Sequence, residues 1–279
     1  MLEQRSKSDQ PLGPDEFSEI TLDLAQQVRE QVTCELDVPY GDHERHKVDI
    51  YVPNGTNFAP LPVFMYMHGG YWSSGDKTRA AYLAPCVISA PAIYVAVGFR
   101  LATEVKYPGP VDDCRKALAW VHKNISRYGG DPNRIFVGGH SSGGHLSSLI
   151  TLQEDKRRRL GLPDDVIKGC FPTSGVFDLS EPKRIETFLN SPDEVEEASP
   201  LFQVSGNTVP FFIIIGENDG PEHRSHYHAM VEALGNEQGP IESSDIKGVN
   251  HFEIGLWGSQ MDSLWATKVR QWLNHPPIS

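Results

Sequence analysis

The chain has 279 residues, of which 39% are hydrophobic and 22% are charged, and its formal net charge is −12. This size and composition are typical of a globular protein. The negative charge argues against nucleic-acid binding, which depends on neutralisation of phosphates by Lys and Arg. A membrane protein is not expected either, because no run approaches the roughly 18 consecutive apolar residues of a transmembrane helix.

The chain begins with polar residues and has no apolar run of the kind found in secretory signals, which predicts a cytoplasmic location. Its four cysteines form no C-x-x-C pair, so we expect buried free thiols and neither a zinc site nor a redox motif. They are Cys34, Cys86, Cys114 and Cys170. The single dense basic run, residues 156–159, is expected to be a solvated loop.

Residues 1–30 are predicted to form an N-terminal arm with a helical pattern that packs across the body or over a site. Alternation of apolar and polar residues predicts strands over 32–38 and 47–52, paired as an antiparallel hairpin at a sheet edge. A continuous apolar run over 62–67 predicts a buried strand, and a helix is expected around 79–88.

The middle of the chain alternates between strands and helices. Residues 92–97 predict a buried strand, and apolar residues at intervals of three and four predict an amphipathic helix over 111–125. A short strand over 135–137 is followed by a glycine-rich turn and by a helix that begins near His145. Another short strand is predicted over 166–172.

The last third of the chain starts with an irregular, proline-containing section over 174–209. The most apolar strand is predicted over 211–215, and a helix follows from Pro221, since proline is favoured at the first helical position. A weak strand over 243–246 and a C-terminal helix over 261–272 complete the chain.

This order of elements predicts an α/β fold. The hydrophobic strands indicate a mostly parallel, doubly wound sheet of about eight strands with helices on both faces. No shift in composition marks a second domain, so residues 1–279 are predicted to form one domain, with 174–209 as a small cap inserted between two strands.

Residues 139–143 read Gly-His-Ser-Ser-Gly and match the G-x-S-x-G pattern of a nucleophile elbow. A serine on a sharp strand-to-helix turn needs neighbours without bulk, and Gly139 and Gly143 provide that room around Ser141. Similar turns also occur in phosphate loops and ordinary strand-to-helix corners. Other segments of the chain are therefore needed to show whether Ser141 is a nucleophile.

A serine nucleophile needs a base that is oriented by an acid, and this architecture places them in the order Ser, acid, His. Asp219 stands just beyond the strand over 211–215 and is the preferred acid, with helix N-capping as its alternative role. Glu217 is the competing acid. His251, in the loop after the last strand, is preferred as the base over His275 in the proline-rich tail.

The other histidines are not expected to act in catalysis. His140 and His145 lie on the elbow and its helix. His223, His226 and His228 stand at i, i+3 and i+5 of one helix and do not share a single face, so no metal site is predicted.

Acyl transfer also needs N–H donors for the oxyanion. We expect them from Ser142, directly after the nucleophile, and from Gly69 and Gly70 in the loop after the third strand. Aromatic residues beside these groups either line a substrate pocket or pack in the core. They are Tyr71, Trp72 and Phe252.

Four segments together resemble the α/β-hydrolase fold enzymes, and within them the arylformamidases (kynurenine formamidases). The segments are residues 68–72, 139–146, 216–222 and 250–252. The first reads His-Gly-Gly-Tyr-Trp, whereas the related hormone-sensitive-lipase-like esterases usually carry His-Gly-Gly-Gly. By this resemblance the family's nucleophile, acid and base fall on Ser141, Asp219 and His251, and its oxyanion loop on Gly69 and Gly70.

The resemblance implies a cofactor-independent serine hydrolase that cleaves an aryl formamide such as N-formylkynurenine through an acyl-enzyme. The chain departs from the family pattern after Glu222, which leaves a carboxylesterase or amidase for other aryl or small acyl compounds as the alternative. A catalytically silent ligand-binding homologue is disfavoured because all three triad positions are filled. The expected partner is a small aryl amide or ester, and the sequence is compatible with a homodimer.

Overall fold

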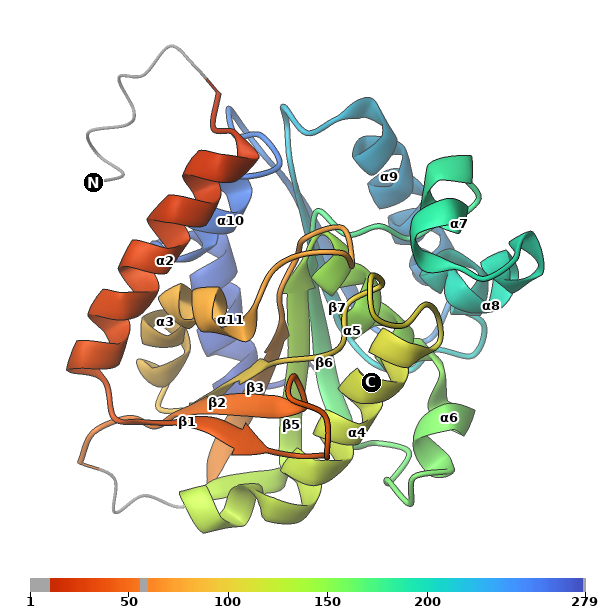
Figure 1. The fold of residues 1–279 in the computed structure, drawn as a ribbon. Coiled ribbons are helices and arrows are strands. Elements are labelled where there is room, and N and C mark those ends of the chain that lie inside the picture. Colours follow the sequence, from red (N-terminus) through yellow and green to blue (C-terminus); the bar gives the residue numbers. More distant parts are fainter. Residues whose placement is uncertain (1–10, 56–59, 278–279) are drawn as a thin grey trace.

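The computed structural model describes residues 11–55 and 60–277, and an eight-stranded sheet forms its centre (Figure 1). The strand order is β1-β2-β4-β3-β5-β6-β7-β8. The pairs β1–β2 and β2–β4 are antiparallel and the other pairs are parallel, which confirms the predicted sheet and its edge hairpin. The strands are β1 (Cys34–Pro39), β2 (Lys47–Tyr51), β3 (Leu61–Met67), β4 (Ile93–Val97), β5 (Gly130–His140), β6 (Ile167–Thr173), β7 (Phe211–Gly216) and β8 (Ile241–Ile246).

Helices cover both faces of the sheet, as predicted (Figure 1). The α-helices are α2 (Pro14–Gln31), α3 (Ala84–Ile88), α4 (Gly109–Asn124), α5 (Ser142–Leu152), α6 (Glu154–Arg158), α7 (Pro182–Phe188), α8 (Val195–Ala198), α9 (Pro221–Gly235), α10 (Glu253–Gly258) and α11 (Leu264–Asn274). The 3-10 helices are η1 (Lys77–Leu83), η2 (Ile125–Tyr128), η3 (Pro192–Glu194) and η4 (Pro200–Gln203).

Strand β3 shows how the sequence builds two cores. Every residue of this strand is buried, and successive side chains point to opposite faces of the sheet. Val63 and Met65 pack into one core with α4, α5 and α9, whereas Phe64 and Tyr66 pack into a second core with α3 and α11. Each such buried side chain contributes about 1.5–3 kcal/mol of hydrophobic stabilisation, so the sheet is held firmly from both sides.

Several boundaries differ from the prediction. Helix α5 begins at Ser142 rather than near His145, and β5 runs from Gly130 to His140 rather than over 135–137. The strand is longer because Gly139 and His140 continue the parallel pairing with β3 and β6, which sequence periodicity does not reveal. The single C-terminal helix expected over 261–272 is preceded by a separate helix, α10.

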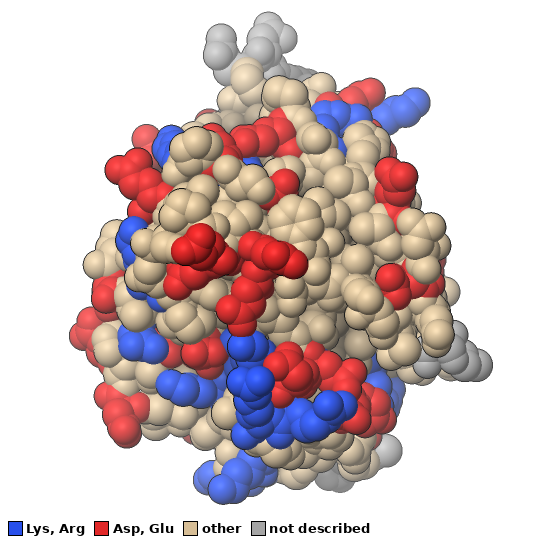
Figure 2. Space-filling model, turned by 90° about the vertical axis from the view of Figure 1, so that its right-hand side faces the viewer, with Lys and Arg blue, Asp and Glu red and all other residues tan. Residues whose placement is uncertain are grey.

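The basic run over 156–159 was predicted to be a solvated loop, and this was wrong. Most of it lies in α6, and Arg157 is almost fully buried, where its guanidinium donates to the carbonyl oxygens of Ile150 and Asp164. On the face drawn in Figure 2, Lys and Arg side chains lie next to Asp and Glu rather than forming an unbroken basic surface. Within the basic run, Lys156 pairs with Glu197.

The helices and the cysteines of the described residues complete the description of the fold. None of the helices in the described part of the chain is long and apolar enough to cross a bilayer. All four cysteines are free, and three of them are buried, while Cys34 is half-buried.

Candidate active site

The turn between β5 and α5 has the geometry of a nucleophile elbow. Ser141 has a φ of 56° and a ψ of −121°, an unfavourable backbone conformation for a residue with a side chain. A Cβ atom on Gly143 would lie 2.0 Å from the Met67 carbonyl oxygen, and one on Gly139 would lie 2.3 Å from the backbone of Gly143. The glycines are therefore required because β3, β5 and α5 meet within contact distance at this turn.

The loop after β3 lies directly against the elbow. A Cβ atom on Gly69 would lie 2.9 Å from the His140 carbonyl oxygen and 3.3 Å from the Ser141 Cβ atom. Gly70 has a φ of 128°, which turns the backbone in a way that L-residues rarely allow. Among the described residues, no hydrogen bond uses the N–H groups of Gly69, Gly70 or Ser142. These three N–H groups therefore have no hydrogen-bond partner among the described residues, as the predicted oxyanion donors require.

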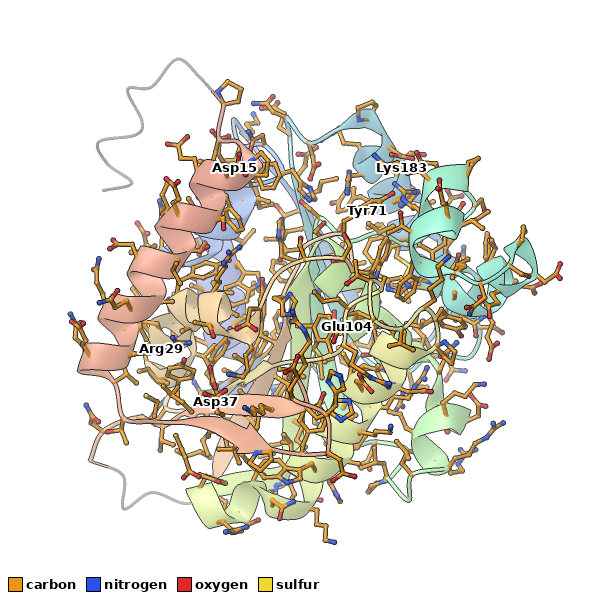
Figure 3. The ribbon with its side chains drawn as sticks, viewed as in Figure 1. Asp15, Arg29, Asp37, Tyr71, Glu104 and Lys183 are labelled. Carbon is orange, nitrogen blue, oxygen red and sulfur yellow. The ribbon has the colours of Figure 1, made fainter. Side chains whose placement is uncertain are left out.

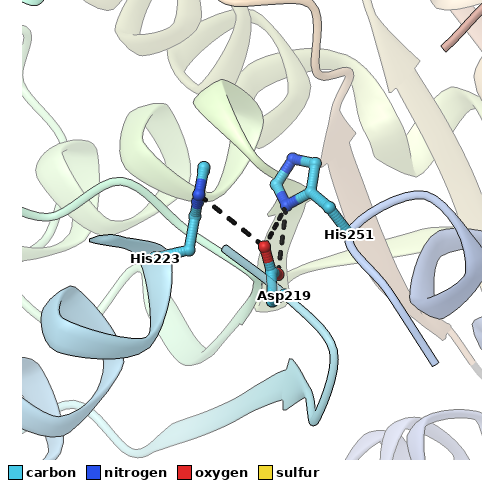
Figure 4. Close-up of side chains that lie close together, drawn as sticks. All are labelled: Asp219, His223 and His251. Atoms are coloured by element: carbon cyan, nitrogen blue, oxygen red, sulfur yellow. Dashed lines mark hydrogen bonds and ion pairs between the residues drawn. The ribbon is translucent and has the colours of Figure 1, made fainter. Parts of the chain in front are cut away.

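The loop after β7 carries Asp219, the predicted acid. Asp219 is 6% exposed, and its carboxylate accepts a hydrogen bond from His251 Nδ1, with distances of 3.0 and 3.1 Å to the two oxygens (Figure 4). Burial acts to raise the pKa of this carboxyl, but its hydrogen bond and charge interaction with His251 prevail and lower the pKa to about 2. The N-cap of α9 is Gly220, so Asp219 does not take the capping role considered as its alternative. Glu217 lies apart and accepts from the Gly248 N–H at 2.9 Å.

The loop after β8 presents His251. Because Nδ1 donates to Asp219, the neutral ring leaves Nε2 unprotonated and able to accept a proton. The His251 carbonyl oxygen lies 2.7 Å from His140 Nε2, and the two rings pack with centroids 4.7 Å apart. His140 thus holds the loop in place, while burial, assisted by the nearby His251, lowers the pKa of His140 to about 3.

Ser141 and His251 line one cavity of about 370 Å³. Among the described residues, the Ser141 hydroxyl does not donate a hydrogen bond to the His251 ring. Hydrogen bonds of this kind often tighten only when substrate is bound.

Aromatic side chains form much of the rest of the cavity. Helix α2 supplies Phe17, whose ring packs against Phe252 at 5.7 Å and Tyr82 at 6.4 Å. Tyr71 also lines the cavity, and Lys183 of α7 lies 5.7 Å from the centre of its ring (Figure 3). Tyr71 and Phe252, each expected either in the pocket or in the core, lie at the pocket.

Trp72 belongs to the core instead. It is 1% exposed, and its ring stacks on Phe188 of α7 at 4.7 Å. Its Nε1 donates to His145 Nδ1 at 3.1 Å, so the other nitrogen of His145 carries the proton and donates to the Ala198 carbonyl oxygen at 2.8 Å. The pair therefore joins the loop after β3 to the section over 174–209, and it does not line the pocket.

Several cavity-lining residues were not predicted from the sequence, and Phe17 and His223 are two of them. Phe17 was part of the predicted arm, but the sequence showed only that it belongs to a helical pattern and not which residues it contacts. His223 was considered with His226 and His228, yet it lies apart from them, with its ring 4.3 Å from that of His251 and its Nδ1 3.7 Å from Asp219. Burial and the neighbouring His251 lower the pKa of His223 to about 4.

The described residues contain one group of side chains with the spacing of metal ligands, formed by Asp219, His223 and His251. The ring of His226 is buried and contacts the Phe177 N–H, whereas His228 is exposed.

Known proteins are similar to this chain over most of its length. A model of the BD-FAE family matches residues 48–226, well over half of the chain. The chain belongs to the BD-FAE family. Kynurenine formamidase of Salmo salar is 29% identical to this BD-FAE member over 230 residues, which cover 78% of the chain and 75% of the relative. Esterase LipC of Mycobacterium tuberculosis is 29% identical over 217 residues, which cover 71% and 54%.

Solved structures share the fold of this BD-FAE member. The thermophilic carboxylesterase EstE1, from a metagenomic library, superimposes with a TM-score of 0.75 at 20% identity and covers 94% of this chain and 98% of its own. An esterase of Pyrobaculum calidifontis has a TM-score of 0.75 at 22% identity, with coverage of 93% and 90%. The protein is an α/β-hydrolase of the arylformamidase and esterase group, as its sequence motifs predict.

Proposed function

We propose that the protein is a serine hydrolase that cleaves aryl formamides such as N-formylkynurenine. In this proposal Ser141 is the nucleophile, His251 is the general base and Asp219 orients the His251 ring. The N–H groups of Gly70 and Ser142, with that of Gly69 beside them, stabilise the oxyanion. The observation that carries the proposal is the hydrogen bond between Asp219 and His251, because His251 lines the same cavity as Ser141 on its strained elbow.

The reaction has two steps. The Ser141 Oγ attacks the formyl carbon while His251 Nε2 takes the hydroxyl proton, and the tetrahedral intermediate places negative charge on the former carbonyl oxygen. The C–N bond then breaks, and His251 returns the proton to the departing aryl amine. Water attacks the formyl ester on Ser141 with His251 again as base, which releases formate and restores the hydroxyl.

The shape of the cavity supports a small acyl group and an aromatic leaving group. Around Ser141, the backbones of Gly69 and His140 approach within contact distance, so little room remains on that side for a large acyl chain. The rings of Phe17, Tyr71 and Phe252 line the remaining cavity and offer an apolar surface to an aryl amine. The kynurenine formamidase relatives further support this choice.

The alternative is a carboxylesterase or amidase for other aryl or small acyl compounds. The same aromatic cavity suits an aryl ester, and several relatives are named as esterases. A substrate panel separates the two. We expect a higher kcat/KM for N-formylkynurenine than for p-nitrophenyl acetate, and a steep fall from acetate to longer acyl esters. A preference for butyrate or longer chains over the formamide would favour the esterase.

A fluorophosphonate probe tests the shared chemistry before any substrate is known. An active serine hydrolase becomes labelled at Ser141, as peptide mass spectrometry would show. Unlabelled, folded protein would instead support the silent ligand-binding homologue.

The remaining expectations belong to the same proposal. They are a cytoplasmic location, a small-molecule partner with no nucleic acid or membrane, no required cofactor, and one domain over 1–279 with a cap over 174–209. The arrangement of α7, α8 and their connecting turns beside Trp72 and His145 supports the cap. Light scattering during size-exclusion chromatography tests for the homodimer.

A further inference from the structure

His223 gives the active site a third metal-binding group that the proposed hydrolysis does not use. Its ring lies on α9 and faces the Asp219–His251 pair from the side opposite to the β8 loop (Figure 4). One donor atom from each of Asp219, His223 and His251 can be chosen so that all three lie within 4.8 Å of one another. Two imidazoles and a carboxylate are a typical ligand set for zinc.

We propose that Asp219, His223 and His251 form a zinc-binding site whose occupation inhibits the hydrolase. The binding part stands on the geometry alone, whereas the inhibition rests on the proposed function. The site is thus a regulatory one and supplies no chemistry to the reaction.

The distances suit a tetrahedral ion. Zinc binds His nitrogen and carboxylate oxygen at about 2.0–2.2 Å, which places tetrahedral ligand atoms about 3.3 Å apart. The Asp219 Oδ1 atom lies 3.0 Å from His251 Nδ1 and 3.7 Å from His223 Nδ1. These two separations are within about half an ångström of that requirement, and no pair among the three chosen ligand atoms is more than 4.8 Å apart, so side-chain rotations complete the site. Water would provide the fourth ligand.

The ion can reach the site from the substrate cavity. His223 and His251 both line this cavity, and their side chains are 22% and 18% exposed, whereas the Asp219 carboxylate lies fully buried behind them. The nearby cation Arg184 is paired with Glu222 at 3.0 Å and Glu181 at 3.3 Å, which offsets its repulsion of a divalent ion.

Zinc at this position would stop catalysis through the tautomer of His251. A neutral imidazole carries one proton, and a metal binds through a nitrogen lone pair. Zinc bound to Nδ1 therefore leaves the ring proton on Nε2. Nε2 in this form cannot accept the proton of the Ser141 hydroxyl. The Asp219 carboxylate is drawn to the metal at the same time and no longer orients the ring. Both effects remove the general base.

The test compares two substitutions on the same helix. His223→Gln removes the third ligand, and His228→Gln makes the same change at an exposed position five residues further along α9. Hydrolysis of an aryl ester is measured against zinc chloride in chelator-free buffer, and each variant's rate is divided by its own zinc-free rate. We expect wild type and His228→Gln to be inhibited alike, and His223→Gln to need at least about tenfold more zinc. Equal zinc sensitivity of all three proteins would overturn the proposal.

Direct binding separates this proposal from the proposed function. Equilibrium dialysis with zinc needs no turnover, and we expect one site per chain that is weakened at least about tenfold by His223→Gln. On the wild-type protein, NMR of ¹⁵N-labelled histidines should show zinc-dependent shifts for His223 and His251 but not for His228. This measurement remains decisive if His223→Gln does not fold. Zinc that leaves the His223 and His251 signals unchanged would disprove the site, whether or not the protein hydrolyses formamides.

Discussion

The two sides of the cavity are built in different ways. The chemical side consists of residues at the carboxyl ends of β3, β5, β7 and β8, where the backbones touch so closely that a Cβ atom on Gly143 would overlap the β3 carbonyl. The opposite side is α2, a helix at the surface that packs along η1 and is also held by hydrogen bonds from Arg29 to Asp49 at 3.3 Å and to the Thr78 carbonyl at 3.0 Å (Figure 3). The sheet thus fixes the reacting groups, while a peripheral helix shapes what can bind beside them.

The largest expected effect is on the chemical side. Ser141→Ala removes the proposed nucleophile, and we expect kcat to fall by about 10⁴-fold or more, as for other triads. The matched control is Ser148→Ala in α5, since the Ser148 hydroxyl is buried and has no hydrogen-bond partner among the described residues. Steady-state kinetics of both variants check this. Full activity of Ser141→Ala would contradict the proposed mechanism.

The choice between the two acids gives the next prediction. Asp219→Asn keeps the shape of the side chain but presents the wrong hydrogen-bonding partner to His251 Nδ1, and we expect kcat to fall by about 10³- to 10⁴-fold. Glu217→Gln should leave kcat within about twofold, because the Glu217 side chain is exposed and contacts the Gly248 N–H instead. A larger loss with Glu217→Gln than with Asp219→Asn would reverse the assignment.

The close packing of the chemical side can be tested with a pair of glycines. Gly143→Ala would place a Cβ atom 2.0 Å from the Met67 carbonyl, so the backbone must shift, and we expect a loss of about 3 kcal/mol or more in the free energy of unfolding. Gly13→Ala, at the N-cap of α2, meets nothing within 4 Å and has an ordinary φ of −98°, so only the weaker capping by alanine remains and its effect should stay within about 1 kcal/mol. Urea denaturation measures both. Similar losses at the two sites would contradict the contrast between the two sides.

The chemical side was predictable from the sequence because its constraints are local. The glycines around Ser141, the order of Ser141, Asp219 and His251, and the glycines of the β3 loop all mark backbone positions that the sequence displays directly. The other side was not predictable in the same way. Nothing in the helical pattern around Phe17 says which ring it meets, and Trp72 and Tyr71 are adjacent in sequence but point into the core and the pocket respectively.

The position of His223 beside His251 could not be predicted from the sequence either. Its spacing from His226 and His228 is a property of one helix. Its nearness to His251 depends instead on the packing of α9 against the β8 loop, which brings together residues 28 positions apart (251 − 223). The length of β5 was underestimated for a related reason, since the pairing of Gly139 and His140 is provided by neighbouring strands.

The smallest expected effect concerns the α2 side, where the change should alter selectivity rather than chemistry. Phe17→Ala removes a ring that packs against Phe252 and Tyr82, and loss of such an apolar contact surface is worth about 1.5–3 kcal/mol to an aryl substrate. We therefore expect kcat/KM for an aryl formamide to fall by about 10- to 100-fold, mainly through KM, with a smaller change for a substrate without a ring. Leu22→Ala, at a 47% exposed position of the same helix, should change neither value. A side chain that contacts only the aryl ring of a substrate cannot slow the reaction of a substrate without a ring. An equal loss of kcat/KM for both substrates in Phe17→Ala would therefore mean that α2 supports the catalytic groups themselves.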